Sequence, residues 1–174
     1  MKLVWLGKSG FVLQSGGTTI AIRDTTLDRS HLAEADLVVS LCATADLPLF
    51  DKSLRTATRH HRPLDDAGAK EAAVMRVDKA TLVIDASGEQ RTILQATDRA
   101  DGDWGRWADR AVIVMAGAGH SIIRSGLKAL DRARPSVIAV AVADGEVEEV
   151  LVQLSSARGE TGLQILDPGL ALEA

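Results

Sequence analysis

Residues 35–47 read ADLVVSLCATADL, and this stretch is the most informative part of the chain for its fold. Its first half, residues 37–41, is a continuous apolar run, which is typical of a β-strand covered on both faces. The run ends at Leu41, and small or polar residues follow from Cys42 to Asp46. The stretch therefore predicts a buried strand whose carboxyl end leads into a loop carrying Cys42 and Asp46.

Short apolar runs elsewhere in the chain predict a mixed α/β protein. The further predicted strands cover residues 2–6, 11–14, 18–22, 73–77, 81–85, 91–96, 111–115 and 137–142. A helix between the last two strands would be capped by Ser121. It would present Ile123, Leu127 and Leu130 on one apolar face. A last helix is predicted over residues 147–154.

The order of these segments resembles the metallo-β-lactamase fold, and within it the metal-dependent hydrolases related to L-ascorbate-6-phosphate lactonase. MKLVWLGKSGFVLQSGGTTIAIRDTTL is similar to the first strands of that family, which carry an LGHS motif. TLVIDASGEQRTILQATDRADG is similar to its next hairpin, which places Asp98 at the position of a metal-bridging aspartate. AVIVMAGAGHSIIRSGLKALDRARPSVIAVAVADG and the closing LQILDPGLALEA resemble the remaining strands and helix.

The resemblance covers nearly the whole chain except residues 51–72, and it implies both fold and domain organisation. The implied fold is a shortened αββα sandwich, in which two mixed sheets are flanked by helices. With 174 residues, the chain is expected to form a single domain, residues 1–174.

Most of the family's metal ligands are replaced in this sequence. The family motif HxHxDH falls on residues 42–47, which read CATADL, so only Asp46 is kept. The histidine of LGHS becomes Lys8, and the aspartate of an Asp-Pro pair becomes Arg23. The resemblance thus leaves Asp46 and Asp98 in one pocket without the imidazoles of a dinuclear zinc site.

These substitutions suggest that side-chain cations replace the metal charge. Buried carboxylates without a counter-charge are costly, so we hypothesise that Lys8 and Arg23 pair with Asp46 and Asp98. The alternative is that all these side chains point to solvent at separate strand ends.

The preferred functional prediction is a pseudoenzyme without a metal cofactor, kept for ligand binding, regulation or assembly. Catalysis in this family needs a metal-activated water, for which the sequence offers no evident ligand set. The alternative is a hydrolase with a one-metal Zn or Mn site drawn from Cys42, Asp46, Asp98 and His120. His120 is also the candidate catalytic acid–base group, although a surface or capping role fits it as well.

Composition limits the partners that the protein is expected to bind. The net charge of −4 and the scarcity of aromatic residues argue against nucleic acid, and no apolar run predicts a membrane span. The single cysteine agrees with a reducing cytoplasm. The expected partner is an unknown small ligand or protein, and a homo-oligomer is an open alternative. Trp104 and Trp107 are predicted to pack in the core, and His60 and His61 to lie in a solvated loop.

Overall fold

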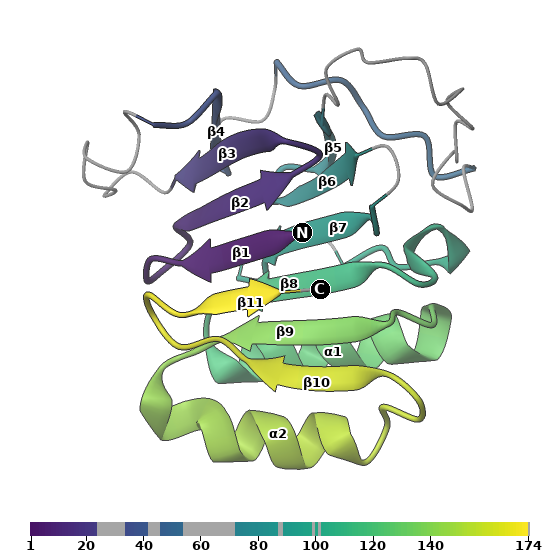
Figure 1. The fold of residues 1–174 in the computed structure, drawn as a ribbon. Coiled ribbons are helices and arrows are strands. Elements are labelled where there is room, and N and C mark those ends of the chain that lie inside the picture. The colour runs from purple at the N-terminus through teal and green to yellow at the C-terminus, as the bar shows by residue number, and fades with distance from the viewer. Residues whose placement is uncertain are drawn as a thin grey trace.

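The structure, a computed structural model, describes residues 1–23, 34–41, 46–53, 72–86, 89–98, 100 and 102–173. In these residues, two mixed β-sheets lie face to face (Figure 1). The first sheet has the order β11-β1-β2-β3-β4 and consists of β1 (Lys2–Trp5), β2 (Phe11–Ser15), β3 (Thr18–Arg23), β4 (Leu37–Ser40) and β11 (Ala171–Glu173). The second has the order β10-β9-β8-β7-β6-β5 and consists of β5 (Ala72–Asp78), β6 (Thr81–Ala86), β7 (Thr92–Ala96), β8 (Val112–Ala116), β9 (Val137–Ala141) and β10 (Gly162–Ile165).

The helices pack on the second sheet, on the face opposite the first sheet. They are α1 (Gly119–Arg132) and α2 (Val147–Ser155), with short 3-10 helices η2 (Arg106–Ala108) and η3 (Asp144–Glu146). Both α-helices share one apolar core with this sheet, and the described residues place no helix on the first sheet. Two mixed sheets are therefore confirmed, while helices on both outer faces are not found in the described part of the chain. None of the described helices is long and apolar enough to cross a membrane.

Strand β8 shows why the second sheet is a central layer. All of its residues are buried, and successive side chains face opposite cores. Val112 and Val114 lie in the core between the sheets, whereas Ile113 and Met115 lie in the core under the helices. Because side chains alternate along a strand, a continuous apolar run is needed when both faces are covered.

Strand β4 departs from the prediction that it is covered on both faces. It pairs in parallel with β3 and forms the edge of the first sheet in the described residues. Leu37 is 38% exposed and Val38 is 43% exposed, while Val39 and Leu41 are buried. The apolar run identified the strand correctly, but its apolar residues do not all belong to the core.

Helix α1 differs from the prediction at its N-cap and in part of its apolar face. The helix begins at Gly119, after the N-cap residue Ala118, so Ser121 lies in its first turn rather than at its cap. The buried side includes Ile122, Gly126 and Ala129, and the predicted face residue Leu127 is 36% exposed. An added Cβ on Gly126 would lie 2.7 Å from Leu154 Cδ2 of α2. The close approach of α1 to α2 therefore requires glycine at residue 126, while the predicted face residues Ile123 and Leu130 are partly buried and pack against the core under the helices.

Strand directions bring several carboxyl ends to one end of the sandwich. In the first sheet, β1 and β3 both run antiparallel to β2, and β4 runs parallel to β3. In the second sheet, β7 to β10 run parallel to one another. The carboxyl ends of parallel strands are where ligand sites of open α/β sheets generally form.

Candidate functional site

A pocket of about 480 Å³ lies at these strand ends, between the two sheets. Its wall includes residues at or just after the carboxyl ends of β1, β4, β7, β8 and β9. The described residues that line this strand-end pocket are Trp5, Gly7, Lys8, Ser9, Leu41, Ala96, Asp98, Ala116, Gly117, Ala141, Val142 and Ala143.

Lys8 is held at the mouth of the pocket by a tight turn after β1. The turn is closed by the Gly10 amide, which donates to the Gly7 carbonyl at 3.0 Å. Trp5 Nε1 donates to the Lys8 carbonyl at 2.8 Å, which fixes both the turn and the indole ring. Lys8 has a φ of 50°, a left-handed conformation that is unfavourable for a residue with a side chain. This turn therefore holds an exposed lysine in a strained backbone position at the pocket rim.

Asp98 comes from the second sheet, directly after β7, and caps the start of α1. Its carboxylate oxygens accept the Ala118 amide at 3.3 and 3.4 Å. A carboxylate at a helix N-terminus is stabilised both by the free amides there and by the helix dipole. Asp98 therefore has a structural role, and its exposed carboxylate also lines the pocket.

Gly117 allows this carboxylate to approach the end of β8. Its φ of 147° is one that residues with a side chain rarely adopt. A Cβ at this position would also lie 3.0 Å from Asp98 Oδ2, and still closer to the side chain of Thr97. Thr97 Oγ1 in turn donates to the Ala116 carbonyl at 3.1 Å. Glycine is therefore required both by the backbone conformation and by the packing of the aspartate.

The structure brings together only part of the predicted site. Lys8 and Asp98 line the same pocket, but no ion pair joins Lys8 to Asp98 or Asp46 in the described part of the chain. Arg23, at the end of β3, and Asp46 are exposed and are not among the described wall residues. Charge compensation by Lys8 and Arg23 thus stays a prediction.

The other predicted site residues stand apart from the pocket wall or lie outside the described residues. His120 is exposed in the first turn of α1, where its Nε2 lies 3.2 Å from Ser121 Oγ. Cys42 lies outside the described residues, as do His60 and His61. Trp104 and Trp107 are buried in the core under the helices and stack with ring centroids 5.7 Å apart, which confirms their predicted packing role.

The donor set of the described wall does not fit a metal centre. Asp98 is its one carboxylate, and the other polar side chains are those of Lys8 and Ser9. Among the described residues, no group of three or more His, Cys, Asp or Glu side chains could hold a metal ion. Catalytic zinc usually takes three protein ligands, so the described wall falls short of that number.

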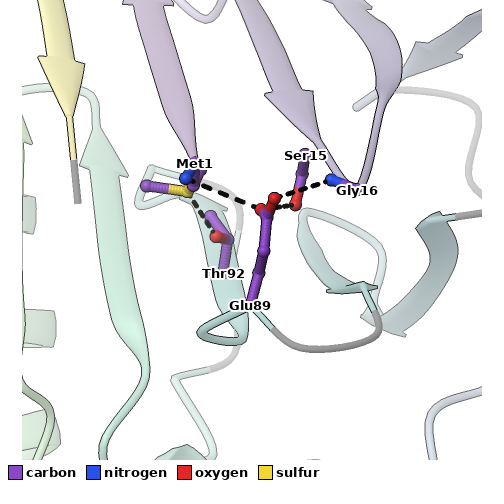
Figure 2. Close-up of polar contacts among 5 residues, drawn as sticks. All are labelled: Met1, Ser15, Gly16, Glu89 and Thr92. Carbon is purple, nitrogen blue, oxygen red and sulfur yellow. Dashed lines mark hydrogen bonds and ion pairs between the residues drawn. The ribbon is translucent and has the colours of Figure 1, made fainter. Parts of the chain in front are cut away.

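A second polar cluster, which the sequence did not predict, joins the two sheets at the opposite end of the sandwich (Figure 2). There Glu89 accepts the Ser15 hydroxyl at 2.6 Å and the Gly16 amide at 2.9 Å. Its carboxylate also lies 3.6 Å from the Met1 amine, and the Thr92 hydroxyl donates to Met1 Sδ. We call these five residues the Glu89 cluster.

The Glu89 cluster shifts the acidity of its central carboxyl group. Partial burial acts to raise the pKa of Glu89, but the hydrogen bonds from Ser15 and Gly16 and the positive Met1 amine outweigh it. The net effect holds the pKa of Glu89 below its ordinary value of 4.5. In the sequence, the segments around Ser15 and Glu89 carry only ordinary glycine turns. Such turns do not indicate which segments of the chain meet in the folded protein.

Comparison with known proteins supports the fold. No protein-family model and no curated protein matches the sequence. A solved structure, that of Igni18, a novel metallo hydrolase from the hyperthermophilic archaeon Ignicoccus hospitalis, aligns with a TM-score of 0.56. The alignment covers 99% of this chain and 98% of that one, at 17% sequence identity. The chain has a metallo-hydrolase fold. At this identity the likeness concerns the fold alone.

Proposed function

We propose that this protein is a metallo-hydrolase-fold pseudoenzyme of the metallo-β-lactamase type, which binds a small ligand in the strand-end pocket without metal-dependent catalysis. The observation that carries the proposal is a pocket at the strand ends whose described wall lacks most of the metal ligands of the resembling hydrolases. The pocket keeps a volume of about 480 Å³, which is within the usual range for small-molecule sites. Its described wall offers one ammonium and one carboxylate where a hydrolase needs several metal ligands.

The placement of Lys8 supports this proposal chemically. In the resembling hydrolases, related to L-ascorbate-6-phosphate lactonase, the equivalent position is the histidine of LGHS. A lysine ammonium is a fixed positive charge that can attract an anionic group but has no free lone pair for a metal. The turn holds Lys8 in an unfavourable left-handed backbone conformation, and this strain argues for a use of its side chain at the pocket. We propose that this ligand binding takes place in the cytoplasm.

The competing proposal is a hydrolase with one Zn or Mn held by Cys42, Asp46, Asp98 and His120. Its support is that the structurally similar Igni18 is described as a metallo hydrolase. It requires His120 and Asp46 to join Asp98 at the pocket, and neither is among the described wall residues.

Metal analysis and activity assays on the same preparation distinguish the two proposals. We expect the full chain, purified without chelators from medium containing Zn and Mn, to carry far less than one metal ion per chain. We also expect no hydrolysis of phosphodiester, lactone, thioester or β-lactam substrates above background, with or without either metal. The Asp98→Ala variant should behave in the same way.

A matched variant makes the contrary result interpretable. Asp167→Ala removes an exposed carboxylate that is not part of the described pocket wall. Stoichiometric metal and turnover in the wild type and in Asp167→Ala, both lost in Asp98→Ala, would overturn the pseudoenzyme proposal in favour of the one-metal hydrolase.

A further inference from the structure

The strand-end pocket combines an apolar interior with two opposite charges at its rim. Buried apolar residues of both sheets form its interior, including Trp5, Leu41 and Val142. Lys8 and Asp98, the charged residues of its described wall, are both exposed. They come from different sheets, because Lys8 follows β1 and Asp98 follows β7. A ligand that satisfies both charges must therefore contact residues that follow strands of both sheets.

We infer that the pocket binds an α-amino acid with a large apolar side chain, its carboxylate facing Lys8 and its ammonium facing Asp98. This inference rests on the proposed ligand-binding function and specifies its ligand class. A zwitterion carries both complementary charges within one small head group and adds no net charge to the site. A simple carboxylate or amine would leave one of the two protein charges unmatched.

Both protein charges have the capacity to receive such a head group. In the described part of the chain, Lys8 forms no ion pair, so its ammonium can direct three donors to a ligand. Asp98 accepts the Ala118 amide through long contacts of 3.3 and 3.4 Å. An ionised carboxylate has about four acceptor positions, so most of this capacity is left for a ligand ammonium.

The interior of the pocket accounts for the apolar side chain. Ala96, Ala116 and Ala141 end their strands with small side chains, which leaves room between the sheets. The Trp5 ring forms part of the wall and is held by its hydrogen bond to the Lys8 carbonyl. Ligand pockets are typically apolar with a few placed polar groups, which is the distribution found here.

The three tryptophans of the chain provide a site-specific test. Trp5 lines the pocket, whereas Trp104 and Trp107 lie in the core under the helices and act as internal references. We would titrate the metal-free full chain with L-phenylalanine and follow the indole N–H resonances by NMR. We expect saturable movement of the Trp5 resonance alone. 3-Phenylpropanoate and 2-phenylethylamine, which each lack one charge, should bind about 5-fold more weakly or worse.

Variants that each remove one charge test which protein residue contacts the carboxylate of the ligand and which contacts its ammonium. In Lys8→Met, L-phenylalanine should bind no better than 2-phenylethylamine, because the carboxylate contact is gone. In Asp98→Asn, which keeps an acceptor for the Ala118 amide, L-phenylalanine should bind no better than 3-phenylpropanoate, because the ammonium contact is gone. Lys2→Met and Asp167→Asn remove exposed charges that are not on the described pocket wall and should keep the wild-type preference.

Contrary results overturn the inference and the proposed function separately. If 3-phenylpropanoate or 2-phenylethylamine binds as tightly as L-phenylalanine, or if none of the three moves the Trp5 resonance, the amino-acid inference is wrong. Stoichiometric metal and hydrolytic turnover in the same preparation would instead overturn the proposed pseudoenzyme function.

Discussion

Gly117 is the residue at the pocket whose replacement can be predicted most directly. Alanine at this position would have to adopt a φ of 147° and place its Cβ against Thr97 and Asp98. We expect Gly117→Ala to lower the free energy of unfolding by about 2 to 4 kcal/mol, from backbone strain together with overpacking. Urea denaturation followed by circular dichroism measures this change.

A second glycine separates the two causes. Gly17 has a φ of 81°, but a Cβ there would meet no atom within 4 Å. Gly17→Ala should therefore show backbone strain alone, about 1 to 2 kcal/mol. Equal losses in the two variants would mean that Thr97 and Asp98 do not obstruct a side chain at residue 117.

At the residue scale, four charged residues were grouped from the sequence, and of these Lys8 and Asp98 line the described pocket wall whereas Arg23 and Asp46 do not. The order of motifs indicated that Lys8 and Asp98 lie near each other, and both line the pocket. It could not indicate that Asp98 caps α1, because that role depends on where the helix begins. Glu89 escaped notice because its partners Ser15 and Gly16 lie more than seventy residues away along the chain.

At the scale of elements, a buried polar network ties α1 to the second sheet. Ser125 Oγ donates to Gln95 Oε1 of β7 and accepts Trp104 Nε1 at 3.1 Å. Gln95 Nε2 continues the network to Thr81 Oγ1 on β6 at 3.3 Å. All four side chains are buried, so each polar atom depends on these partners rather than on water.

We expect Ser125→Ala to destabilise the protein by about 1 to 3 kcal/mol, because it leaves Gln95 Oε1 and Trp104 Nε1 buried without this partner. The Trp104 indole N–H should also exchange faster with solvent. The control is Ser156→Ala, which removes an exposed hydroxyl at the end of α2 and should change stability by less than about 0.5 kcal/mol. Equal effects of the two substitutions would argue against the network.

The Glu89 cluster is a contact between elements of both sheets, and its strength should depend on pH. Because the pKa of Glu89 is lower in the folded protein, the charged carboxylate stabilises the fold above its unfolded pKa, near 4.5. This contribution is lost as the pH falls through the lower, folded pKa. The difference in unfolding free energy between wild type and Glu89→Gln should therefore be steady above about pH 5.5 and shrink below pH 4.5.

Chemical denaturation at a series of pH values tests this dependence. Glu160→Gln changes an exposed carboxylate on the loop between α2 and β10 and should show a small difference at every pH. A Glu89→Gln difference that does not change between pH 3 and pH 6 would exclude a contribution from the carboxylate charge.

The α1 helix shows what an apolar pattern can and cannot predict about an element. Its existence and position between β8 and β9 were predicted correctly. Two of its predicted face residues, Ile123 and Leu130, do pack against the core, but Leu127 is exposed, and the close contact with α2 needs Gly126. A single chain has no pattern that marks a glycine as a packing residue, so only the position of α2 reveals the role.

At the scale of the whole molecule, the two sheets share one core and should unfold together. Leu3 and Leu13 of the first sheet lie in the same buried cluster as Leu82 and Leu94 of the second. We expect a single cooperative urea transition in which the indole signals of Trp5 and Trp104 disappear together. This behaviour would also support the prediction of a single domain over residues 1–174. Loss of the Trp5 signal at lower urea concentration would show instead that the first sheet unfolds independently.

For the whole molecule, the sequence predicted the order of strands and helices, and the two sheets followed from the resemblance. The apolar pattern could not predict which strand would form a sheet edge, because β4 and β8 are both apolar runs. The two differ in their neighbours: β8 has strands on both sides, and β4 pairs with β3 alone in the described residues. Such neighbours are set by long-range pairing, which local patterns do not contain.

The pairing of β1 with β11 has a consequence for biosynthesis. The sheet begun by the first strand is completed by the last, with Lys2 opposite Glu173, and the chain ends lie side by side (Figure 1). While a ribosome is still translating the chain, β1 has β2 on one side and an open edge on the other. Open strand edges recruit foreign strands, so a nascent chain is exposed to mispairing at this edge until β11 has been synthesised and pairs with β1. Translation that stops before Ala171 would leave this edge open permanently.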